Sequence, residues 1–314
     1  MTVLKLKTVT RTQGNNAALK DGTVMPAGFE FDFEEVPMLV QAFRRMVRAL
    51  EFDVCEMALT TYLCAREHGV RFTALPIFLV RAFHHAAIVH NTKFAVNDPK
   101  DLEGKRVGVN RGYTVTTGVW ARAILQEEFG VDLSKITWVL SGDEHVEDYV
   151  APPNVVPIEP GTTIEQMLKL GELAAAINIK TDDPDVRPLI PNADEAGIAA
   201  FESRGHYPIN HLVVIRDEVL DALPDVANAV FDAFAESKRL YLERLRAGTI
   251  DSLTTSDQFY MQMMDKVDDP LPYGIAPNRA VLENLIANAT SQGILRKATE
   301  IESVFEPSTI ESTA

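Results

Sequence analysis

Three side chains suited to bind an anion or to move a proton lie close together in the sequence: Arg81, His84 and His85. They stand near the end of an apolar run within residues 72–91, which predicts strand structure. A guanidinium can pair with both oxygens of a carboxylate, and a histidine changes charge near neutral pH. Because neighbouring residues on a strand face opposite sides, His84 and His85 do not easily reach one ligand together. From spacing alone, a structural ion pair for Arg81 and a solvated position for the histidines explain this cluster more simply.

A further histidine, His211, comes directly before the apolar run 212–215, which is typical of a buried strand. We expect the chain to cross between two lobes at the start of this strand. A lone imidazole at the start of a strand is more often structural than functional. The spacing therefore makes His211 a candidate and leaves its role open.

Two expected helices begin at turns that are rich in hydroxyl groups. Free backbone N–H groups and the helix dipole make a helix N-terminus a ready anion site, and hydroxyl groups add donors. Capping by a single threonine is the simpler alternative in both cases. The residues concerned are Arg111, Tyr113, Thr116 and Thr117 at the helix expected over 118–129, and Thr60 at an earlier helix.

Two polar loops follow predicted strands and are also candidates for ligand contact. Arg11 lies in the loop 10–14 after the first strand, and Glu144 lies in the loop 141–145 after the strand at 136–140. Ligands of α/β proteins bind at the carboxyl ends of the strands, where such loops lie. Solvated turns are the alternative for both loops.

Strands alternate with helices along most of the chain. Residues 4–10 alternate as a half-buried strand, and residues 40–50 have helical spacing with one apolar face. Such alternation indicates an α/β protein with mainly parallel sheets flanked by helices. No fixed-period repeat or flexible linker occurs, so two lobes would be joined by short hinge strands.

The composition is that of a folded protein of about two domains. The chain has 314 residues, of which 46% are hydrophobic and 24% charged, and its net charge is −15. This negative charge disfavours nucleic acid and anionic membranes as partners, whereas a few cations in a cleft still attract a small anion. Residues 1–10 lack the apolar core of a signal peptide, and no stretch reaches the ~20 apolar residues of a membrane span. We expect a cytoplasmic protein, and the sequence leaves a homo-oligomer open.

Several familiar kinds of site are missing from the sequence. Cys55 and Cys64 have no CxxC partner, and we expect buried free thiols. No GxGxxG, Walker A, HExxH or GxSxG motif occurs, which disfavours nucleotide, flavin, zinc-protease and serine-hydrolase chemistry. A metal held by His85, His211 and a carboxylate has no support from spacing, so we expect neither a metal nor a cofactor.

The segment DPKDLEGKRVGV at 98–109 resembles the turn and strand that open the second lobe of type II periplasmic-binding-protein folds. Further segments occur in order along nearly the whole chain and are similar to those of the 4,5-dihydroxyphthalate decarboxylase family. These segments are PIFLVRAFHH at 76–85, residues 112–122, LGEL at 170–173, YPINH at 207–211 and YGIAPNR at 273–279. The resemblance implies two lobes with a ligand cleft between them, one of residues 1–92 plus 210–314 and one of residues 93–209.

The same resemblance gives roles to the clustered residues. It implies that Arg81 and His85 contact the ligand, with Arg81 on a retained carboxylate, and that His211 lies in the cleft. One of the two histidines, His85 or His211, would then act as the general acid. His84 stands where an arginine is usual and Leu79 where a proline is common, which affects the identity of the substrate more than the fold.

The implied activity is that of a carboxy-lyase, a cofactor-independent decarboxylase of a hydroxylated aromatic carboxylate of the 4,5-dihydroxyphthalate type. Two alternatives stay open because one fold serves many functions. One is a solute-binding protein for a small anionic ligand, and the other is a different cytoplasmic lyase. For any of them we expect an anion between Arg81 and the helix start at Thr116 and Thr117.

Overall fold

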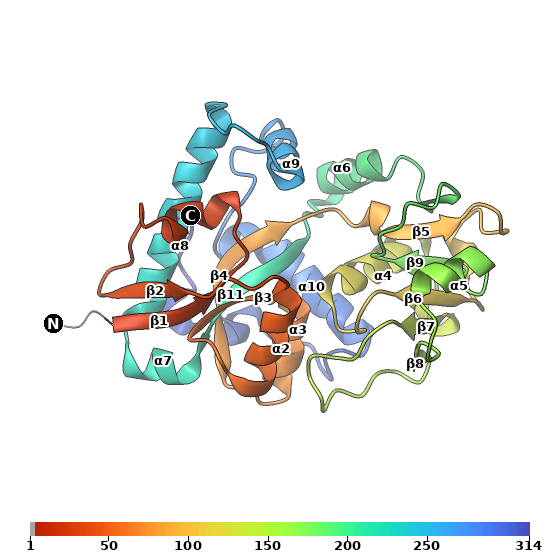
Figure 1. Cartoon of the computed structure of the whole chain (residues 1–314), viewed down its shortest axis with the longest axis horizontal. Helices are drawn as coiled ribbons and strands as arrows, with labels where there is room; N and C mark the ends of the chain where they lie inside the picture. Colours follow the sequence, from red (N-terminus) through yellow and green to blue (C-terminus); the bar gives the residue numbers. More distant parts are fainter. Residues whose placement is uncertain (1–3) are drawn as a thin grey trace. The chain divides into compact units, whose positions relative to one another are not determined.

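The computed structural model describes residues 4–314, which form two α/β units (Figure 1). Unit 1 contains residues 4–82, Ile209–Leu282 and Thr299–Ala314, and unit 2 contains Phe83–Pro208 and Glu283–Ala298. Residues 1–3 of the expected first lobe lie outside the described residues. Each unit has a sheet of its own with helices against it, as the predicted fold class requires.

Unit 1 is built on a five-stranded sheet with the strand order β2-β1-β3-β11-β4. Its strands are β1 (Leu4–Val9), β2 (Phe29–Phe33), β3 (Val54–Ala58), β4 (Phe72–Arg81) and β11 (Ile209–Arg216). β1 is parallel to β2 and β3, whereas β11 is antiparallel to both β3 and β4. Because β1 and β3 are parallel neighbours, the residues that follow them meet at one edge of the sheet.

Helices pack on this sheet through apolar faces. In α2 the residues Ala42, Phe43, Met46 and Val47 are buried at helical spacing, while Arg48 on another face is exposed. The α-helices of unit 1 are α1 (Ala17–Lys20), α2 (Leu39–Ala49), α3 (Leu59–Glu67), α7 (Asp217–Ala222), α8 (Val226–Arg246) and α9 (Thr255–Met264). The 3₁₀ helices are η1 (Gly14–Asn16), η5 (Ala276–Asn278), η6 (Ile301–Val304) and η7 (Pro307–Thr309).

Unit 2 has a six-stranded sheet with the order β10-β5-β9-β6-β7-β8. Its strands are β5 (Ile88–Asn91), β6 (Arg106–Val109), β7 (Thr137–Leu140), β8 (Val155–Pro157), β9 (Ala175–Ile177) and β10 (Val186–Pro188). β9, β6, β7 and β8 form a parallel series, and β5 is antiparallel to β9 and β10. Both sheets are therefore mixed rather than mainly parallel. The antiparallel strand is β11 in unit 1 and β5 in unit 2. Each is the first strand after the chain enters that unit from the other one.

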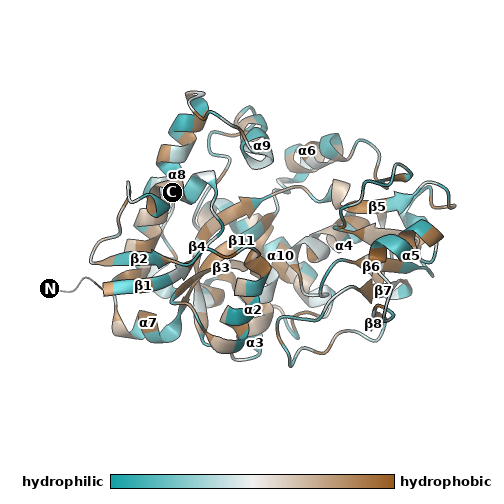
Figure 2. Cartoon of the chain, viewed as in Figure 1, coloured by the Kyte–Doolittle hydropathy of each residue, from teal (hydrophilic) through white to brown (hydrophobic). Residues whose placement is uncertain are grey.

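The core of unit 2 forms where helices meet the parallel strands. Val139 of β7 and Ala176 of β9 pack with Ile164, Met167 and Leu168 of α5. Figure 2 shows the apolar colouring on the strands β6 and β7. The helices are α4 (Thr116–Phe129), α5 (Ile164–Leu170), α6 (Ala193–Arg204), most of α10 (Arg279–Ser291), η2 (His85–Ala87), η3 (Pro99–Leu102) and η4 (Leu133–Lys135).

The boundaries of the units differ from the expected lobes at two places. Residues 83–92, expected in the first lobe, belong to unit 2, because β5 pairs with β9 and β10. Most of α10 also belongs to unit 2, because Asn288 donates to Glu127 and Gln292 accepts from Arg122. The chain therefore changes unit after residues 82, 208, 282 and 298.

Two further features of the described residues bear on the sequence predictions. Cys55 in β3 and Cys64 in α3 are buried free thiols, as predicted. Within residues 4–314, no helix has both the length and the apolar character that a membrane span requires.

Candidate functional site

A buried carboxylate and a half-buried imidazole form a hydrogen-bonded pair on the sheet of unit 1. Glu56 of β3 is fully buried, and its Oε1 lies 2.6 Å from Nδ1 of His211 at the start of β11. The register pairs His211 with Ala58, two residues beyond Glu56, so both side chains lie on one face as diagonal neighbours. The Phe43 ring meets the imidazole edge-on at 5.2 Å between ring centroids. Together these contacts fix the orientation of the His211 ring.

The imidazole keeps one nitrogen available for chemistry. Nδ1 of His211 faces Glu56, which as a carboxylate accepts the Nδ1–H hydrogen bond. Within the described chain, Nε2 of His211 has no hydrogen-bond partner, and the side chain retains 20% of its exposure. Carboxylate-oriented histidines with a free second nitrogen are the general acids and bases of many enzymes.

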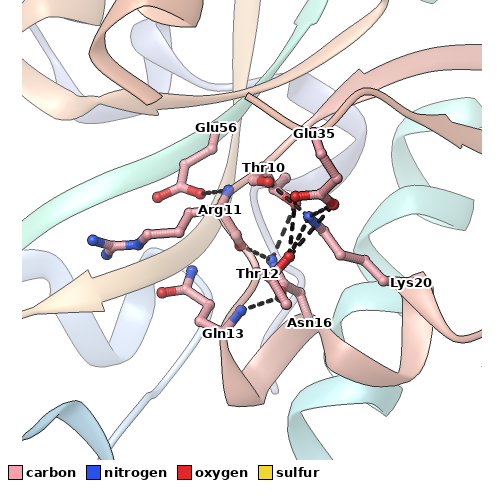
Figure 3. Close-up of polar contacts among 8 residues, drawn as sticks. All are labelled: Thr10, Arg11, Thr12, Gln13, Asn16, Lys20, Glu35 and Glu56. Atoms are coloured by element: carbon pink, nitrogen blue, oxygen red, sulfur yellow. Dashed lines mark hydrogen bonds and ion pairs between the residues drawn. The ribbon is translucent and has the colours of Figure 1, made fainter. Parts of the chain in front are cut away.

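Arg11 reaches the same carboxylate from the loop after β1. Its backbone N–H donates to Oε2 of Glu56 over 2.9 Å, so both oxygens of this buried carboxylate have donors. The Arg11 side chain is exposed, and among residues 4–314 its guanidinium forms no ion pair. Figure 3 shows this guanidinium on the same side of the loop as the Glu56 carboxylate, while Lys20 and Glu35 lie on the other side. The Arg11 backbone is thus bonded to the Glu56–His211 pair, and its exposed guanidinium is a candidate partner for an anionic ligand.

The loop that carries Arg11 is held in place by buried polar contacts (Figure 3). The Asn16 side chain donates to Thr10 Oγ1 at 3.1 Å and to the Arg11 carbonyl at 2.8 Å, and accepts from the Gln13 N–H at 3.0 Å. Gly14 comes directly after Gln13 in this loop. A Cβ at Gly14 would lie 2.0 Å from the Tyr241 ring, so only glycine fits this close approach. The backbone of Arg11 is therefore fixed although its side chain is exposed.

A cavity of about 220 Å³ lies beside this loop, and residues from unit 1 alone line it. Burial raises the pKa of Tyr260 in its wall to about 12, while Arg81 and Arg11 act in the opposite direction. In the part of the chain that is described, the buried amide nitrogen of Gln13 has no hydrogen-bond partner. The lining residues are Arg11, Thr12, Gln13, Gly14, Asn15, Tyr241, Thr254, Ser256, Asp257 and Tyr260.

Arg81 and Thr60, two further candidates from the sequence, also belong to unit 1. Arg81 ends β4 and is almost fully buried, and its Nη2 donates to the side-chain oxygen of Asn278 and to the carbonyl of Pro272 at 3.3 Å. Thr60 is fully buried in the first turn of α3. Two neutral oxygens thus help to anchor the guanidinium of Arg81 inside unit 1.

His84 and His85 fall in unit 2, immediately after the chain leaves unit 1. His85 is fully buried in η2, and its Nε2 lies 3.1 Å from both oxygens of Glu128 in α4. Glu128 also accepts a hydrogen bond from Arg204 of α6 at 2.5 Å. His84 precedes η2 and is buried too. The contacts of His85 hold η2, α4 and α6 together.

The turn before α4 already contains an anion, which the chain itself supplies. The Glu144 carboxylate accepts the N–H groups of Tyr113 and Thr114 and the Thr114 hydroxyl, the last at 2.6 Å. A Cβ on Gly112 would lie 2.5 Å from a Glu144 oxygen, so the loop closes tightly around it. The sequence predicted these N–H groups as donors to a ligand, but Glu144 uses those of Tyr113 and Thr114.

The other residues predicted at this helix start have different surroundings. Thr116 begins α4 and is buried, and the Thr117 hydroxyl accepts from Asn178 at 3.4 Å. Arg111 is exposed and has a positive φ of 72°, and its N–H donates to the Ser141 hydroxyl at 2.7 Å. Although Arg111 is exposed as a residue, neighbouring groups partly desolvate its guanidinium and lower its pKa, so an anionic partner would stabilise the charged form.

The predicted site residues thus form two groups. Unit 1 holds Arg11, Thr60, Arg81 and His211, and unit 2 holds His84, His85, Arg111, Tyr113, Thr116, Thr117 and Glu144. The sequence reasoning missed Glu56, which is the acid in the otherwise apolar strand segment VCEMA. A charged residue inside a fully buried strand was the available signal, because buried charges need partners. No group of three or more metal-ligating side chains occurs within residues 4–314.

The strand order and the two sheets define the class of protein, which is the periplasmic-binding-protein fold. The aliphatic sulphonate binding protein SsuA of Escherichia coli superposes with a TM-score of 0.56 at 11% identity, over 96% of this chain and 92% of SsuA. The desulfurization enzyme DSZB superposes with a TM-score of 0.59 at 12% identity, over 98% and 97% of the two chains. At such identities these likenesses concern the fold alone.

Sequence similarity then gives the family. A 4,5-dihydroxyphthalate decarboxylase of Comamonas testosteroni is 30% identical over 289 residues, covering 87% of each chain. A 4,5-dihydroxyphthalate decarboxylase of Pseudomonas putida is 37% identical over 145 residues, covering 44% of this chain and 56% of that protein. No protein-family model matches the chain. The chain belongs to the 4,5-dihydroxyphthalate decarboxylase family, whose named members are carboxy-lyases.

Proposed function

We propose that this chain is a cofactor-independent decarboxylase of a hydroxylated aromatic carboxylate of the 4,5-dihydroxyphthalate type, with His211 as its general acid. The observation that carries the proposal is the Glu56–His211 pair in a chain of this family. A buried carboxylate orients the imidazole through Nδ1 and leaves Nε2 to deliver a proton.

Arg11 supplies the attraction for the substrate. Its guanidinium is exposed, forms no ion pair with any residue from 4 to 314, and lies on the same side of the loop as Glu56 (Figure 3). A planar guanidinium binds a carboxylate with two parallel hydrogen bonds, which also sets the orientation of the aromatic ring. The charge of Arg81 acts on the nearby Tyr260 and so adds positive potential to this part of unit 1. We assign Arg81 to bind the carboxylate that the product retains.

The chemistry requires one proton transfer and one bond cleavage. A hydroxyl para to the departing carboxylate pushes electron density into the ring, and the imidazolium of His211 protonates the ring carbon that bears this carboxylate. The carbon–carbon bond then breaks, its electron pair restores the aromatic ring, and carbon dioxide leaves. His211 ends as the neutral imidazole and takes a proton from water before the next turnover. A 4,5-dihydroxyphthalate would give a dihydroxybenzoate.

Two contrasts favour His211 over His85, the other histidine that the sequence singles out. The His211 side chain is 20% exposed, whereas His85 has no exposed surface. His85 also uses Nε2 to bind Glu128, which is itself bonded to Arg204. A general acid must approach its substrate within hydrogen-bond distance, and the partly exposed His211 suits this requirement better than the buried His85.

A solute-binding protein without chemistry is the second candidate function. The fold likeness to SsuA, whose name specifies a sulphonate ligand, favours it. Such a protein needs the cation at Arg11 but has no use for an oriented acid. Binding of the aromatic acid without release of carbon dioxide would support this candidate.

Release of carbon dioxide from candidate substrates tests the proposal. The purified protein is expected to decarboxylate 4,5-dihydroxyphthalate and not phthalate, because only the former has hydroxyl groups para to its carboxylates. Equal binding of the two compounds, measured by calorimetry, would show that the hydroxyl groups act in the chemical step. Failure to turn over any hydroxylated aromatic acid would refute the decarboxylase proposal.

A further inference from the structure

A lysine reaches back over the loop that carries Arg11. Lys20 ends α1, and its Nζ donates to the Thr10 carbonyl and to the Thr12 hydroxyl, both at 2.8 Å (Figure 3). Thr10 and Thr12 are the two neighbours of Arg11 in the chain. The Lys20 side chain is only 10% exposed, although lysines are mostly exposed in folded proteins. One ammonium thus holds the chain on both sides of Arg11.

Glu35 balances the charge of this ammonium. Its Oε1 lies 2.5 Å from Nζ of Lys20, and its carboxylate also accepts the Thr12 hydroxyl at 3.3 Å. Glu35 follows β2, the parallel neighbour of β1, so the sheet brings the acid to the same edge as the loop after β1. The charge of Lys20 is therefore compensated within unit 1, whereas the Arg11 guanidinium has no ion pair in residues 4–314.

The backbone groups of Arg11 itself are also bound. Its N–H donates to Glu56 at 2.9 Å, and its carbonyl accepts from the Asn16 side chain at 2.8 Å. Within the described residues, the Arg11 side chain forms no hydrogen bond and is exposed. A side chain on a fixed backbone loses less conformational freedom when it binds a ligand, which favours binding. The contacts around Arg11 are therefore those that a binding residue requires.

Lys20 does not reach the cavity beside Arg11. Among the described residues that line this cavity, Lys20 and Glu35 are absent. Figure 3 shows both side chains on the far side of the loop from the Arg11 guanidinium. An effect of Lys20 on a ligand in the cavity must then pass through the loop, or act at a distance through the charge of the ammonium.

We propose that Lys20 is a positioning residue, which holds residues 10–12 so that the Arg11 guanidinium faces the cavity where the substrate carboxylate binds. The inference rests on the proposed function, in which Arg11 attracts the substrate. Without the ammonium, the Thr10 carbonyl and the Thr12 hydroxyl lose this donor, and the loop gains freedom that binding must then remove. The affinity for the substrate thus depends on a second cation that does not touch the substrate.

Calorimetric titration of the whole chain with phthalate tests the proposal, because it measures affinity without turnover. Lys20→Met should weaken phthalate binding about 3–30-fold. Lys20→Arg keeps the charge and several donors, and should restore most of the affinity. Lys5→Met on β1 is the matched control: it removes an equal charge from a side chain that is 63% exposed, and should leave the affinity unchanged.

Glu35→Ala separates positioning from simple attraction between charges. Loss of an acid raises the positive potential, so an effect of charge alone predicts tighter binding of an anion. Positioning predicts the opposite, because Lys20 loses an acceptor and holds the loop less firmly. We expect phthalate binding to weaken about 2–5-fold in Glu35→Ala. Tighter binding in this variant would contradict the proposal.

A double-mutant cycle with Arg11→Met shows whether Lys20 acts through Arg11. If it does, Lys20→Met has no further effect on phthalate binding once the Arg11 guanidinium is gone. A general loss of stability or of positive charge would weaken binding equally with and without that guanidinium. Equal losses in the two backgrounds, in variants that fold as judged by thermal denaturation, would overturn the positioning role.

The outcomes separate this inference from the proposed function. Weaker binding in Arg11→Met together with wild-type affinity in Lys20→Met refutes the positioning role alone. Wild-type phthalate affinity in Arg11→Met refutes the proposed role of Arg11, and the inference with it. Should Lys20→Met fail to fold, Glu35→Ala takes its place in the cycle, since this acid is 64% exposed and acts on the loop through Lys20.

Discussion

The carboxylate of Glu56 and the imidazole of His211 lie 2.6 Å apart although 155 residues separate them in the sequence. Their contact arises because β11 pairs antiparallel with β3, which places His211 opposite Ala58 and diagonally across from Glu56. The Glu56 carboxylate is fully buried and receives a second hydrogen bond from the Arg11 backbone. The pair is thus a fixed part of the sheet and not a contact between mobile surface side chains.

Glu56→Gln should lower kcat by roughly 10²–10⁴-fold, because an amide can present its NH₂ group to Nδ1 and then no longer fixes the tautomer and orientation of the imidazole. KM should change little, since the Glu56 carboxylate is fully buried and both its oxygens already accept hydrogen bonds from the chain. Glu51→Gln is the matched control, because Glu51 is an exposed acid that pairs with Lys7 and Arg45 on the surface of the same unit. Steady-state kinetics on 4,5-dihydroxyphthalate measures both variants. Wild-type kcat in Glu56→Gln would remove Glu56 from the mechanism.

Arg11→Met should raise KM about 10–150-fold with a smaller change in kcat. The expected loss corresponds to one charge-assisted hydrogen-bond pair, about 1.5–3 kcal/mol. Arg48→Met on the exposed face of α2 is the control for a change of net charge. The thermal stability of Arg11→Met should equal that of the wild type, because no ion pair in residues 4–314 involves its guanidinium. A lowered stability with unchanged KM would mean that Arg11 is structural.

Glu144→Ala should lower the free energy of unfolding by about 1–3 kcal/mol, because it leaves the buried N–H groups of Tyr113 and Thr114 without an acceptor. Asp148→Ala, at an exposed position further along the same loop, should have no measurable effect. Urea denaturation of the three proteins provides the comparison. If Glu144→Ala is as stable as the control, the carboxylate is not what holds the turn before α4.

The stability of unit 2 should fall on mild acidification because of His206. Burial and the charge of Arg204 lower the pKa of His206 to about 4, from about 6.5 in an unfolded chain. Between pH 6.5 and pH 4 the unfolded chain binds a proton that the folded chain does not, so the stability decreases as the pH falls through this window. The full effect, on the order of 3 kcal/mol, is reached below pH 4.

His206→Phe tests this effect, because phenylalanine keeps a ring against Trp120 without a titrating group. The melting temperature of the variant should depend less steeply on pH between 6.5 and 4 than that of the wild type. The comparison uses slopes, so a constant packing loss in the variant does not affect it. Parallel slopes for the two proteins would contradict the assignment.

Local sequence patterns predicted the elements but not the pairings that create the site. The alternation in 4–10 gave β1 and the apolar face of 40–50 gave α2, because both patterns depend only on near neighbours in the sequence. The acid in the buried segment VCEMA signalled that Glu56 needs a partner, but its partner could not be named, since His211 lies on a strand that joins the sheet 155 residues later. The assignment of 83–92 to the first lobe failed for the same reason, because β5 is placed by β9 and β10.

The turn before α4 illustrates a second limit. Its N–H groups suggested a site for an anionic ligand, and Glu144 was recognised separately as a polar residue after a strand. That Glu144 itself would be this anion depends on the loops after β6 and β7 meeting at the edge of two parallel strands. The sequence indicated the helix start and the acid separately. Their contact depends on the pairing of β6 with β7, which local patterns do not predict.

The most direct test of the account compares carbon dioxide release from 4,5-dihydroxyphthalate by the wild type, His211→Gln and His85→Gln. We predict that His211→Gln lowers kcat by about 10²–10⁴-fold with little change in substrate affinity. His85→Gln should retain most of its turnover and lose thermal stability, because His85 binds Glu128 inside unit 2. Full turnover by His211→Gln, or loss of turnover confined to a stably folded His85→Gln, would contradict the assignment of His211 as the general acid.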